Sequence, residues 1–429
     1  MPDGAGIDRR NGVAAYVAVT AAYWAFMLTD GALRMLVLLH FHTLGFSPIQ
    51  LAYLFLLYEL AGIVTNLSAG WVAARFGLTS TLYAGLSIQV FALAALSQLD
   101  PAWSIVASVA FVMAVQGASG VAKDLAKMSA KSAVKVLAPE DQQGALFRWV
   151  AVLTGSKNAV KGFGFLLGAG LLGLVGFKAS VIAMAVALAI ILAAVSFLMP
   201  AGLPQGKRTA RFKDVFSKDR NINRLSAARM FLFGARDVWF VVGIPIYFYA
   251  VLSDGSEGGN RDAFFLIGSF MALWIVGYGA VQASAPALLR AAGDSVARTV
   301  GRARLWVGLL TMIPASLSIA AWVAGDGHPG WLTVVLVTGL LLFGAVFAIN
   351  SSLHSYLILA FSDRDRVTMN VGFYYMSNAA GRLLGTLLSG VSYQMGGLSL
   401  CLGTAAAMAG LSWFCAVRLS KIGFDVSYR

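Results

Sequence analysis

The sequence predicts an all-α polytopic membrane protein with twelve transmembrane helices in two six-helix bundles. Of its 429 residues, 59% are hydrophobic and only 12% are charged, whereas soluble proteins are about half apolar and about a quarter charged. A series of apolar segments, each long enough to cross a bilayer, follows along the chain. The longest polar stretch lies in the middle of this series, as expected for two bundles joined by a linker.

The apolar segments fall into two sets of six. The first set covers residues 13–41, 48–74, 80–99, 102–122, 147–175 and 178–198. The second set covers residues 226–252, 262–288, 305–324, 331–359, 368–392 and 397–417. We therefore assign 1–199 to an N-terminal bundle, 200–225 to a basic cytoplasmic linker, and 226–429 to a C-terminal bundle with a short cytoplasmic tail.

The lysines and arginines predict the orientation of the chain. They concentrate at both termini, in the linker and in alternate loops, whereas the remaining loops carry only Lys178 and Arg261. Because basic loops stay in the cytoplasm, we expect both termini to be cytoplasmic. The net charge of +13 is thus explained largely by topology, and we expect no nucleic-acid partner.

Cysteine and histidine are scarce. Cys401 and Cys415 lie in the last apolar segment, too far apart on one helix to form a disulfide. The four histidines show no metal-ligand spacing, and no catalytic arrangement of Ser, His and Asp stands out. We therefore expect no metal, no cofactor and no catalytic residues.

The fifth segment carries two lysines. Lys157 and Lys161 are one helical turn apart and share a face. A lysine near the middle of a membrane is costly unless it faces a water-filled cavity or a partner. No acid accompanies the pair in this segment, which favours a site for an anion. Gly164, Gly168 and Gly170 predict close packing of a neighbouring helix.

The first two segments place charges inside the N-terminal bundle. Asp30 and Arg34 are one turn apart, so they form either a structural ion pair or a resting pair in which Arg34 holds the substrate during transport. Glu59 is either a proton-coupling group or a partner for one of the cations, because burial raises the pKa of a lone carboxyl group.

The C-terminal bundle contributes further charges. Arg229 is expected to extend to the cytoplasmic surface. Arg236 and Asp237 are adjacent on one helix, where side chains point about 100° apart, so we expect them to have different partners. Arg382 lies in the eleventh segment, where Tyr374 and Asn378 occupy a stripe expected to face the cavity. His354 is expected to be a packing residue rather than a proton relay.

A basic helix continues the fourth segment. Lys123, Lys127, Lys131 and Lys135 share one side of this helix. They form either a stripe that faces solvent and lipid headgroups, or a cytoplasmic mouth where Lys123 and Lys127 attract anions.

The embedded cations Arg34, Lys157, Lys161, Arg236 and Arg382 outnumber the embedded acids Asp30, Glu59 and Asp237. An excess of positive charge in a cavity is relieved by an anionic ligand. Arginine suits phosphate-like and carboxylate groups because it binds them in a bidentate manner, and lysine adds a point charge. The sequence therefore predicts a carrier of a small anionic substrate, with Asp30, Glu59 and Asp237 as coupling or charge-pairing groups.

Two resemblances narrow this prediction. The loop after the second segment matches the major facilitator signature at Gly70, Ala73, Arg75 and Gly77, although Ala74 replaces its acid. Three parts of the chain resemble ArsJ-type organoarsenical efflux permeases of that superfamily. They are the first two apolar segments together, the stretch KDLAKMSAKSAVK (123–135), and the stretch GSKNAVKGFGFLLG (155–168). This resemblance implies export of 1-arseno-3-phosphoglycerate across the bacterial inner membrane, arsenate resistance, and a functional link to glyceraldehyde-3-phosphate dehydrogenase.

Two alternatives stay open at this point. The substrate could be an ordinary organophosphate such as 3-phosphoglycerate, because phosphate and arsenate differ little in size and charge. A protein of another class, a polytopic membrane enzyme acting on a phosphorylated lipid, is disfavoured by the missing catalytic and metal-binding patterns.

Overall fold

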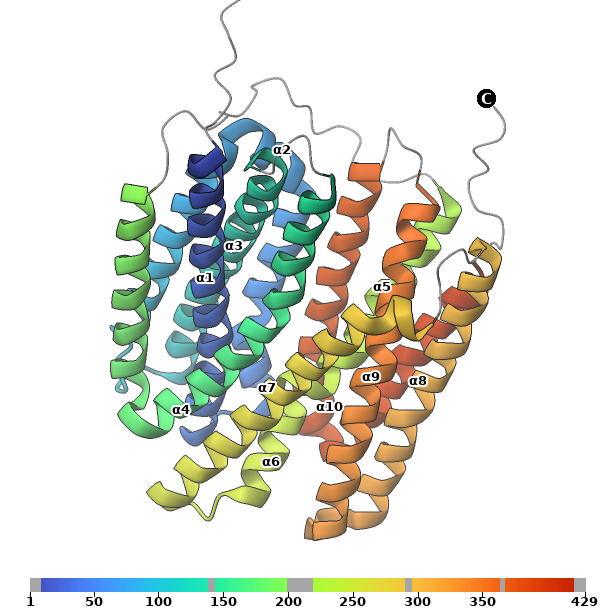
Figure 1. Cartoon of the computed structure of the whole chain (residues 1–429). Coiled ribbons are helices and arrows are strands. Elements are labelled where there is room, and N and C mark those ends of the chain that lie inside the picture. The colour runs from blue at the N-terminus through green and yellow to red at the C-terminus, as the bar shows by residue number, and fades with distance from the viewer. Residues whose placement is uncertain (1–8, 138–142, 199–218, 290–294, 363–366, 420–429) are drawn as a thin grey trace, which may run out of the picture.

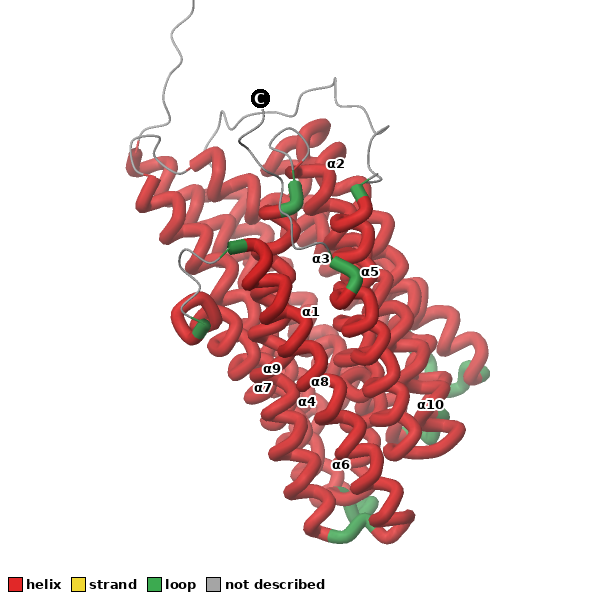
Figure 2. Tube along the Cα trace, turned by 90° about the vertical axis from the view of Figure 1, so that its right-hand side faces the viewer, coloured by secondary structure: helices red, strands yellow, loops and turns green. Residues whose placement is uncertain are grey.

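The computed structural model describes residues 9–137, 143–198, 219–289, 295–362 and 367–419, and the regular structure in these ranges is entirely helical (Figure 2). The helices run roughly side by side as a bundle (Figure 1). The N-terminal half comprises α1 (Arg9–Thr43), α2 (Pro48–Leu96), α3 (Ile105–Leu137) and α4 (Gln143–Leu198).

The C-terminal half contains shorter elements as well as long helices. It comprises α5 (Arg220–Val238), the π-helix η1 (Trp239–Gly243), α6 (Ile244–Leu252), α7 (Glu257–Leu288), α8 (Val296–Ala324), the 3₁₀ turn η2 (Gly325–Gly327), α9 (Gly330–Ala360) and α10 (Val367–Val417). Of the predicted linker, residues 200–218 lie outside the described ranges, and α5 begins within its last part.

The described residues account for the twelve expected crossings. Ten helical segments are long and apolar enough to span a membrane. Two of these, Ser156–Phe197 and Asn370–Val417, are each interrupted by glycine in a non-helical conformation, at Gly176 and at Gly396 and Gly397, and so make two crossings each. Figure 1 shows α4 reversing direction at the lower end of the molecule. The predicted fold class is confirmed.

Long helices are held together in each half by glycines that leave no room for a side chain. Between α1 and α4, a Cβ on Gly164 would lie 2.5 Å from the backbone oxygen of Leu28, and a Cβ on Gly168 would collide with that of Ala32. Between α5 and α10, a Cβ on Gly381 would likewise collide with the backbone oxygen of Met230. Membrane helices commonly pack through such small residues, and the prediction for the fifth segment is confirmed.

The two halves meet through α4 packed on α7 and α2 packed on α10. Gly170 of α4 faces Phe265 of α7, and Gly390 of α10 lies against the carbonyl oxygen of Pro48, where a Cβ would be only 2.5 Å away. These contacts place the interior faces of α1, α2, α4, α5 and α10 around one region, in which the charged side chains gather.

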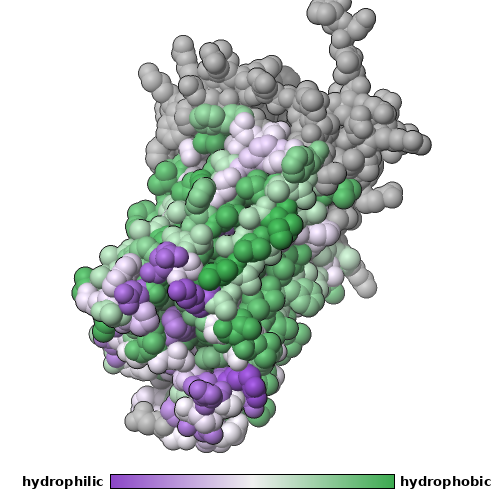
Figure 3. Space-filling model, turned by 90° about the vertical axis from the view of Figure 1, so that its left-hand side faces the viewer, coloured by the Kyte–Doolittle hydropathy of each residue, from purple (hydrophilic) through white to green (hydrophobic). Residues whose placement is uncertain are grey.

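The outer surface fits a lipid environment. Large apolar side chains are exposed on several helices, among them Phe91, Val106, Phe197, Trp322 and Met395. Figure 3 shows hydrophobic residues over most of one face, with hydrophilic residues gathered in its lower part. A soluble protein rarely exposes so large an apolar surface.

The seventh crossing changes helix type near its middle. Pro245 has no N–H to donate to the preceding turn, and the π-helix η1 widens the backbone just before it. The hydroxyl oxygen of Ser389 accepts hydrogen bonds from the backbone N–H groups of Val242 (3.1 Å) and Gly243 (3.3 Å). This irregular segment directly follows Arg236 and Asp237, and π-helical turns are frequent at functional sites.

We expect Gly168→Ala to destabilise the protein by about 1–3 kcal/mol, because the new methyl group must push α1 away from α4. The change is measured as the fall in unfolding temperature of the purified protein in detergent. Gly277→Ala is the matched control, since a Cβ at this α7 position meets nothing within 4 Å. Equal effects of the two substitutions would contradict the role of the close contact.

Candidate functional site

Glu59 lies at the centre of a buried set of charges. Its side chain on α2 is fully buried, and Oε1 accepts hydrogen bonds from Arg34 on α1 (3.1 Å) and from Arg382 on α10 (2.6 Å). Arg34 and Glu59 belong to the N-terminal half and Arg382 to the C-terminal half. One carboxylate therefore accepts a charge-assisted hydrogen bond from each half, and such bonds are stronger than neutral ones.

The chain of charges continues into α5. Arg382 Nε lies 3.4 Å from Oδ2 of Asp237, and Asp237 Oδ1 lies 2.5 Å from Nη2 of Arg236. We call Arg34, Glu59, Arg382, Asp237 and Arg236 the central network. The expectation that Arg236 and Asp237 have different partners is wrong, because the long arginine side chain folds back onto its neighbour.

Asp30 forms a second ion pair beside this network. Its Oδ2 is 3.2 Å from Nζ of Lys161, and its Oδ1 accepts a 2.6 Å hydrogen bond from the hydroxyl group of Tyr58. The ion pair of Arg34 is with Glu59 instead of with Asp30, which lies one turn away on the same helix. The sequence brought the right residues to the interior, but it did not determine which charges pair.

Lys123 and Lys127 turn towards the interior. Lys123 is 8% exposed, and its Nζ lies 4.1 Å from the centre of the Tyr58 ring. Lys127 donates to Asn66 on α2 (3.1 Å) and forms an ion pair with Asp124 (3.5 Å), whose other oxygen accepts from Thr65. The expectation that these two lysines belong to a stripe facing solvent is therefore wrong. The side chains of Lys131 and Lys135 lie outside the described residues.

The other candidate residues lie on α4 and α10, the helices that carry Lys161 and Arg382. Lys157 is half-buried on α4, one residue after Ser156, which accepts a hydrogen bond from Trp24 (2.9 Å). Tyr374 is buried on α10. Asn378 is half-buried one turn later, and its buried Oδ1 has no hydrogen-bond partner.

Arg229 is the residue that the sequence analysis missed. The expectation that it extends to the membrane surface is wrong, because it is 4% exposed. Its Nη1 donates to the carbonyl oxygen (3.1 Å) and the hydroxyl group (2.9 Å) of Ser351 on α9. The run of polar residues from Asn350 to His354 was the signal that could have revealed it, because such a run inside an apolar segment requires polar neighbours.

The site as a whole carries more positive than negative charge. Among the described interior residues, the cations are Arg34, Lys123, Lys127, Lys161, Arg229, Arg236 and Arg382, and the acids are Asp30, Glu59, Asp124 and Asp237. Burying unbalanced charge in a membrane costs several kcal/mol or more. The arrangement is therefore suited to a ligand that supplies negative charge.

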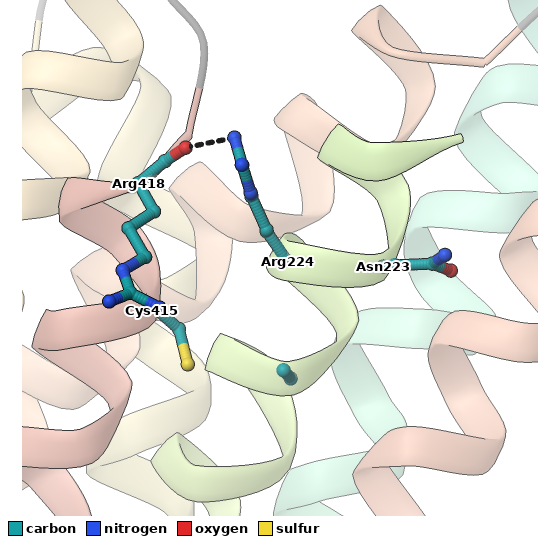
Figure 4. Close-up of a pocket in the computed structure, with 5 residues that line it drawn as sticks. Asn223, Arg224, Cys415 and Arg418 are labelled. Carbon is teal, nitrogen blue, oxygen red and sulfur yellow. Dashed lines mark hydrogen bonds between the residues drawn. The ribbon is translucent and has the colours of Figure 1, made fainter. Parts of the chain in front are cut away.

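Other features of the described residues lie apart from this site. No group of three His, Cys, Asp or Glu side chains that could hold a metal ion occurs in the part of the chain that the structure describes. A cavity of about 480 Å³ lies between α5 and the end of α10, lined by Asn223, Arg224, Ala227, Cys415 and Arg418 (Figure 4). In it Arg224 donates a 2.6 Å hydrogen bond to the carbonyl oxygen of Arg418.

Two helical halves around a buried charged site define a membrane carrier, and comparison with known proteins identifies its family. The sequence model of the Major Facilitator Superfamily matches residues 16–386. Comparison with curated proteins gives no match. The chain belongs to the Major Facilitator Superfamily, so it is a multi-pass secondary transporter of a small molecule and not an enzyme. The alternative of an enzyme acting on a phosphorylated lipid is thereby excluded.

Solved structures share the fold. The chain is similar to a mutant form of the nucleoside transporter NupG (TM-score 0.67, 16% identity, covering 94% of this chain and 98% of that one). It is also similar to a POT family transporter in complex with a thioalcohol-conjugated peptide (TM-score 0.70, 14% identity, covering 95% of this chain and 96% of that one). A third similar structure is a bacterial homologue of the iron transporter ferroportin in an inward-facing state (TM-score 0.69, 13% identity, covering 96% of this chain and 98% of that one). At such low identities these similarities establish the fold alone.

We expect Glu59→Gln to lower the free energy of unfolding by about 3–5 kcal/mol, because it leaves two buried arginines without their shared carboxylate. Thermal unfolding of the purified variant measures this loss. Asp262→Asn is the control, since Asp262 is exposed at the start of α7. Adding Arg34→Gln to Glu59→Gln should recover part of the loss, and an unchanged double variant would argue against the pairing.

Proposed function

We propose that this transporter exports a small organic anion, 1-arseno-3-phosphoglycerate, and thereby confers resistance to arsenate. The observation that carries the proposal is the excess of buried cations, contributed by both halves and held around shared carboxylates. The resemblance of the first two crossings and of the lysine segments to organoarsenical efflux permeases supplies the identity of the anion. Glyceraldehyde-3-phosphate dehydrogenase would be the enzyme that forms it from arsenate.

Alternating access follows from the way the charges are paired. An oxyanion of the substrate competes with Glu59 and Asp237 for Arg382, Arg34 and Arg236, and Lys161 and Lys157 add positive charge from α4. When the substrate neutralises these cations, the halves close around it. After release, Asp30, Glu59 and Asp237 pair with the cations again, so that the empty carrier can return without unpaired buried charge. Tyr374 and Asn378 supply neutral hydrogen-bonding groups at the same site.

The direction of transport rests on the predicted topology. The start of α1, the end of α4 and the start of α5 all lie towards the upper end of Figure 1. The positive-inside rule assigns this end to the cytoplasm of a bacterial inner membrane. Lys123 and Lys127 lie on α3 towards this end, where they would attract anions from the cytoplasm.

We expect Lys161→Ala and Arg382→Lys each to reduce uptake of the organoarsenical anion into everted membrane vesicles about tenfold or more, because each removes a charge-assisted contact. Lys157→Ala should also reduce it. Lys178→Ala is the matched control on the same helix, since Lys178 is exposed. Wild-type uptake by Lys157→Ala and Lys161→Ala would contradict the anion site.

Competition identifies the anion. Inhibition of organoarsenical uptake by excess 3-phosphoglycerate, together with transport of labelled 3-phosphoglycerate at a similar rate, would instead favour an ordinary organophosphate carrier. Uptake of the arsenical that is inhibited by 3-phosphoglycerate, without transport of 3-phosphoglycerate itself, supports the proposal.

A further inference from the structure

Arg229 has no carboxylate partner among the residues that the structure describes. It lies on α5 and is 4% exposed, and its hydrogen bonds to other described residues are made through Nη1, to the carbonyl and hydroxyl groups of Ser351. Its Nε is buried without a hydrogen-bond partner. Guanidinium has five N–H donors, so most of its capacity to bind an anion is unused. A buried arginine in this condition is costly unless something else supplies negative charge.

Unpaired polar groups flank the residue that this arginine contacts. Asn350 and His354 on α9 are fully buried, and none of the four nitrogen and oxygen atoms of their side chains has a hydrogen-bond partner. They flank Ser351, the residue that Arg229 contacts. His354 is three positions after Ser351 and four after Asn350, so it shares a helix face with each of them. Arg229 is also close enough to act electrostatically on His354. We call Arg229, Asn350, Ser351 and His354 the Arg229 cluster.

One aromatic ring connects this cluster to the central network. The guanidinium carbon of Arg229 lies 4.1 Å from the centre of the Phe233 ring, and that of Arg236 lies 4.9 Å from the same ring centre. The two guanidinium groups are therefore no farther apart than the sum of these distances. They are two turns apart on α5 and are held by a side chain that attracts cations to its faces.

We propose that the Arg229 cluster is a second anion subsite, which binds the far anionic group of a substrate whose other anionic group binds at the central network. This inference rests on the proposed function and adds a requirement to it. The substrate is a short molecule with an oxyanion at each end, separated by a spacer of a few atoms. Arg229 supplies charge and planar N–H donors, and His354 and Asn350 supply neutral donors.

A merely structural role for Arg229 predicts something different. If the arginine served only to satisfy the carbonyl group of Ser351, its loss would affect every ligand alike, through folding. If it binds one end of the substrate, its loss must affect ligands with two anionic groups and spare ligands with one. The number of anionic groups on the ligand is therefore the variable to test.

The experiment compares 3-phosphoglycerate, which carries a phosphate and a carboxylate, with glycerol 3-phosphate, which carries only the phosphate. Binding of each to the purified full-length protein in lipid nanodiscs is measured by isothermal titration calorimetry. We expect the wild type to bind 3-phosphoglycerate about tenfold or more tightly than glycerol 3-phosphate, the effect of one charge-assisted contact. In Arg229→Gln this preference should disappear, with the affinity for glycerol 3-phosphate unchanged.

Further variants keep the test decisive if Arg229→Gln does not fold. Arg229→Lys keeps the charge and should retain part of the preference, and Asn350→Ala should reduce it without changing the binding of glycerol 3-phosphate. Arg304→Gln is the matched control, because Arg304 also donates to backbone carbonyl groups, those of Ala416 (3.2 Å) and Leu419 (2.7 Å), away from the site.

The outcomes separate this inference from the proposed function. Equal binding of the two ligands by the wild type, with loss of both in Arg382→Gln, would retain an anion carrier and overturn the second subsite. A preference that survives both Arg229→Gln and Arg229→Lys would also overturn it. Failure of the wild type to bind either anion would overturn both proposals.

Discussion

The ion pair between Glu59 on α2 and Arg382 on α10 is the interaction on which the arrangement of this transporter depends. Charges inside a membrane must be paired, and Glu59 has only one carboxylate to offer to Arg34 and Arg382. Sharing that carboxylate ties the two halves together across the site. It also leaves each cation only partly neutralised, so a ligand with its own negative charge can replace the carboxylate at little net cost. The proposed binding of an anion would thus rest on the same ion pairs that stabilise the empty site.

Most of the fold could be predicted from the sequence, because a bilayer imposes length and apolarity on every crossing. The segments around Gly176 and Gly397 were separated correctly although each pair forms one continuous run of helix. Most of the charges that lie inside were also predictable from their position within apolar segments, the exceptions being Arg229, Lys123 and Lys127. The ion-pair partners of these charges could not be predicted. Spacing along one helix suggested Asp30 as the ion-pair partner of Arg34 and excluded Asp237 as the partner of Arg236. The actual partners depend on how the helices are rotated against one another and on how far long side chains reach.

Arg229 illustrates the same limit. Its position near the cytoplasmic end of the seventh segment suggested a side chain that reaches the surface, and no other residue of that helix argued against this. The polar run on α9, which is distant in sequence, packs against it and keeps it inside. The fold itself does not decide the substrate, because one fold serves many functions. A nucleoside transporter, a POT family transporter and a bacterial homologue of ferroportin share this fold at 13–16% identity, so specificity must come from side chains such as these.

The contact of Gly390 with Pro48 lies at the end of the molecule where α1 passes into α2, and that of Gly268 with Ala169 lies farther along α7 and α4. Both join one half to the other through backbone and methyl groups without any charge. Contacts of this kind carry no charge, unlike the ion pairs of the central network. Such contacts depend on how well two uncharged surfaces fit, whereas the central network depends on the pairing of charges.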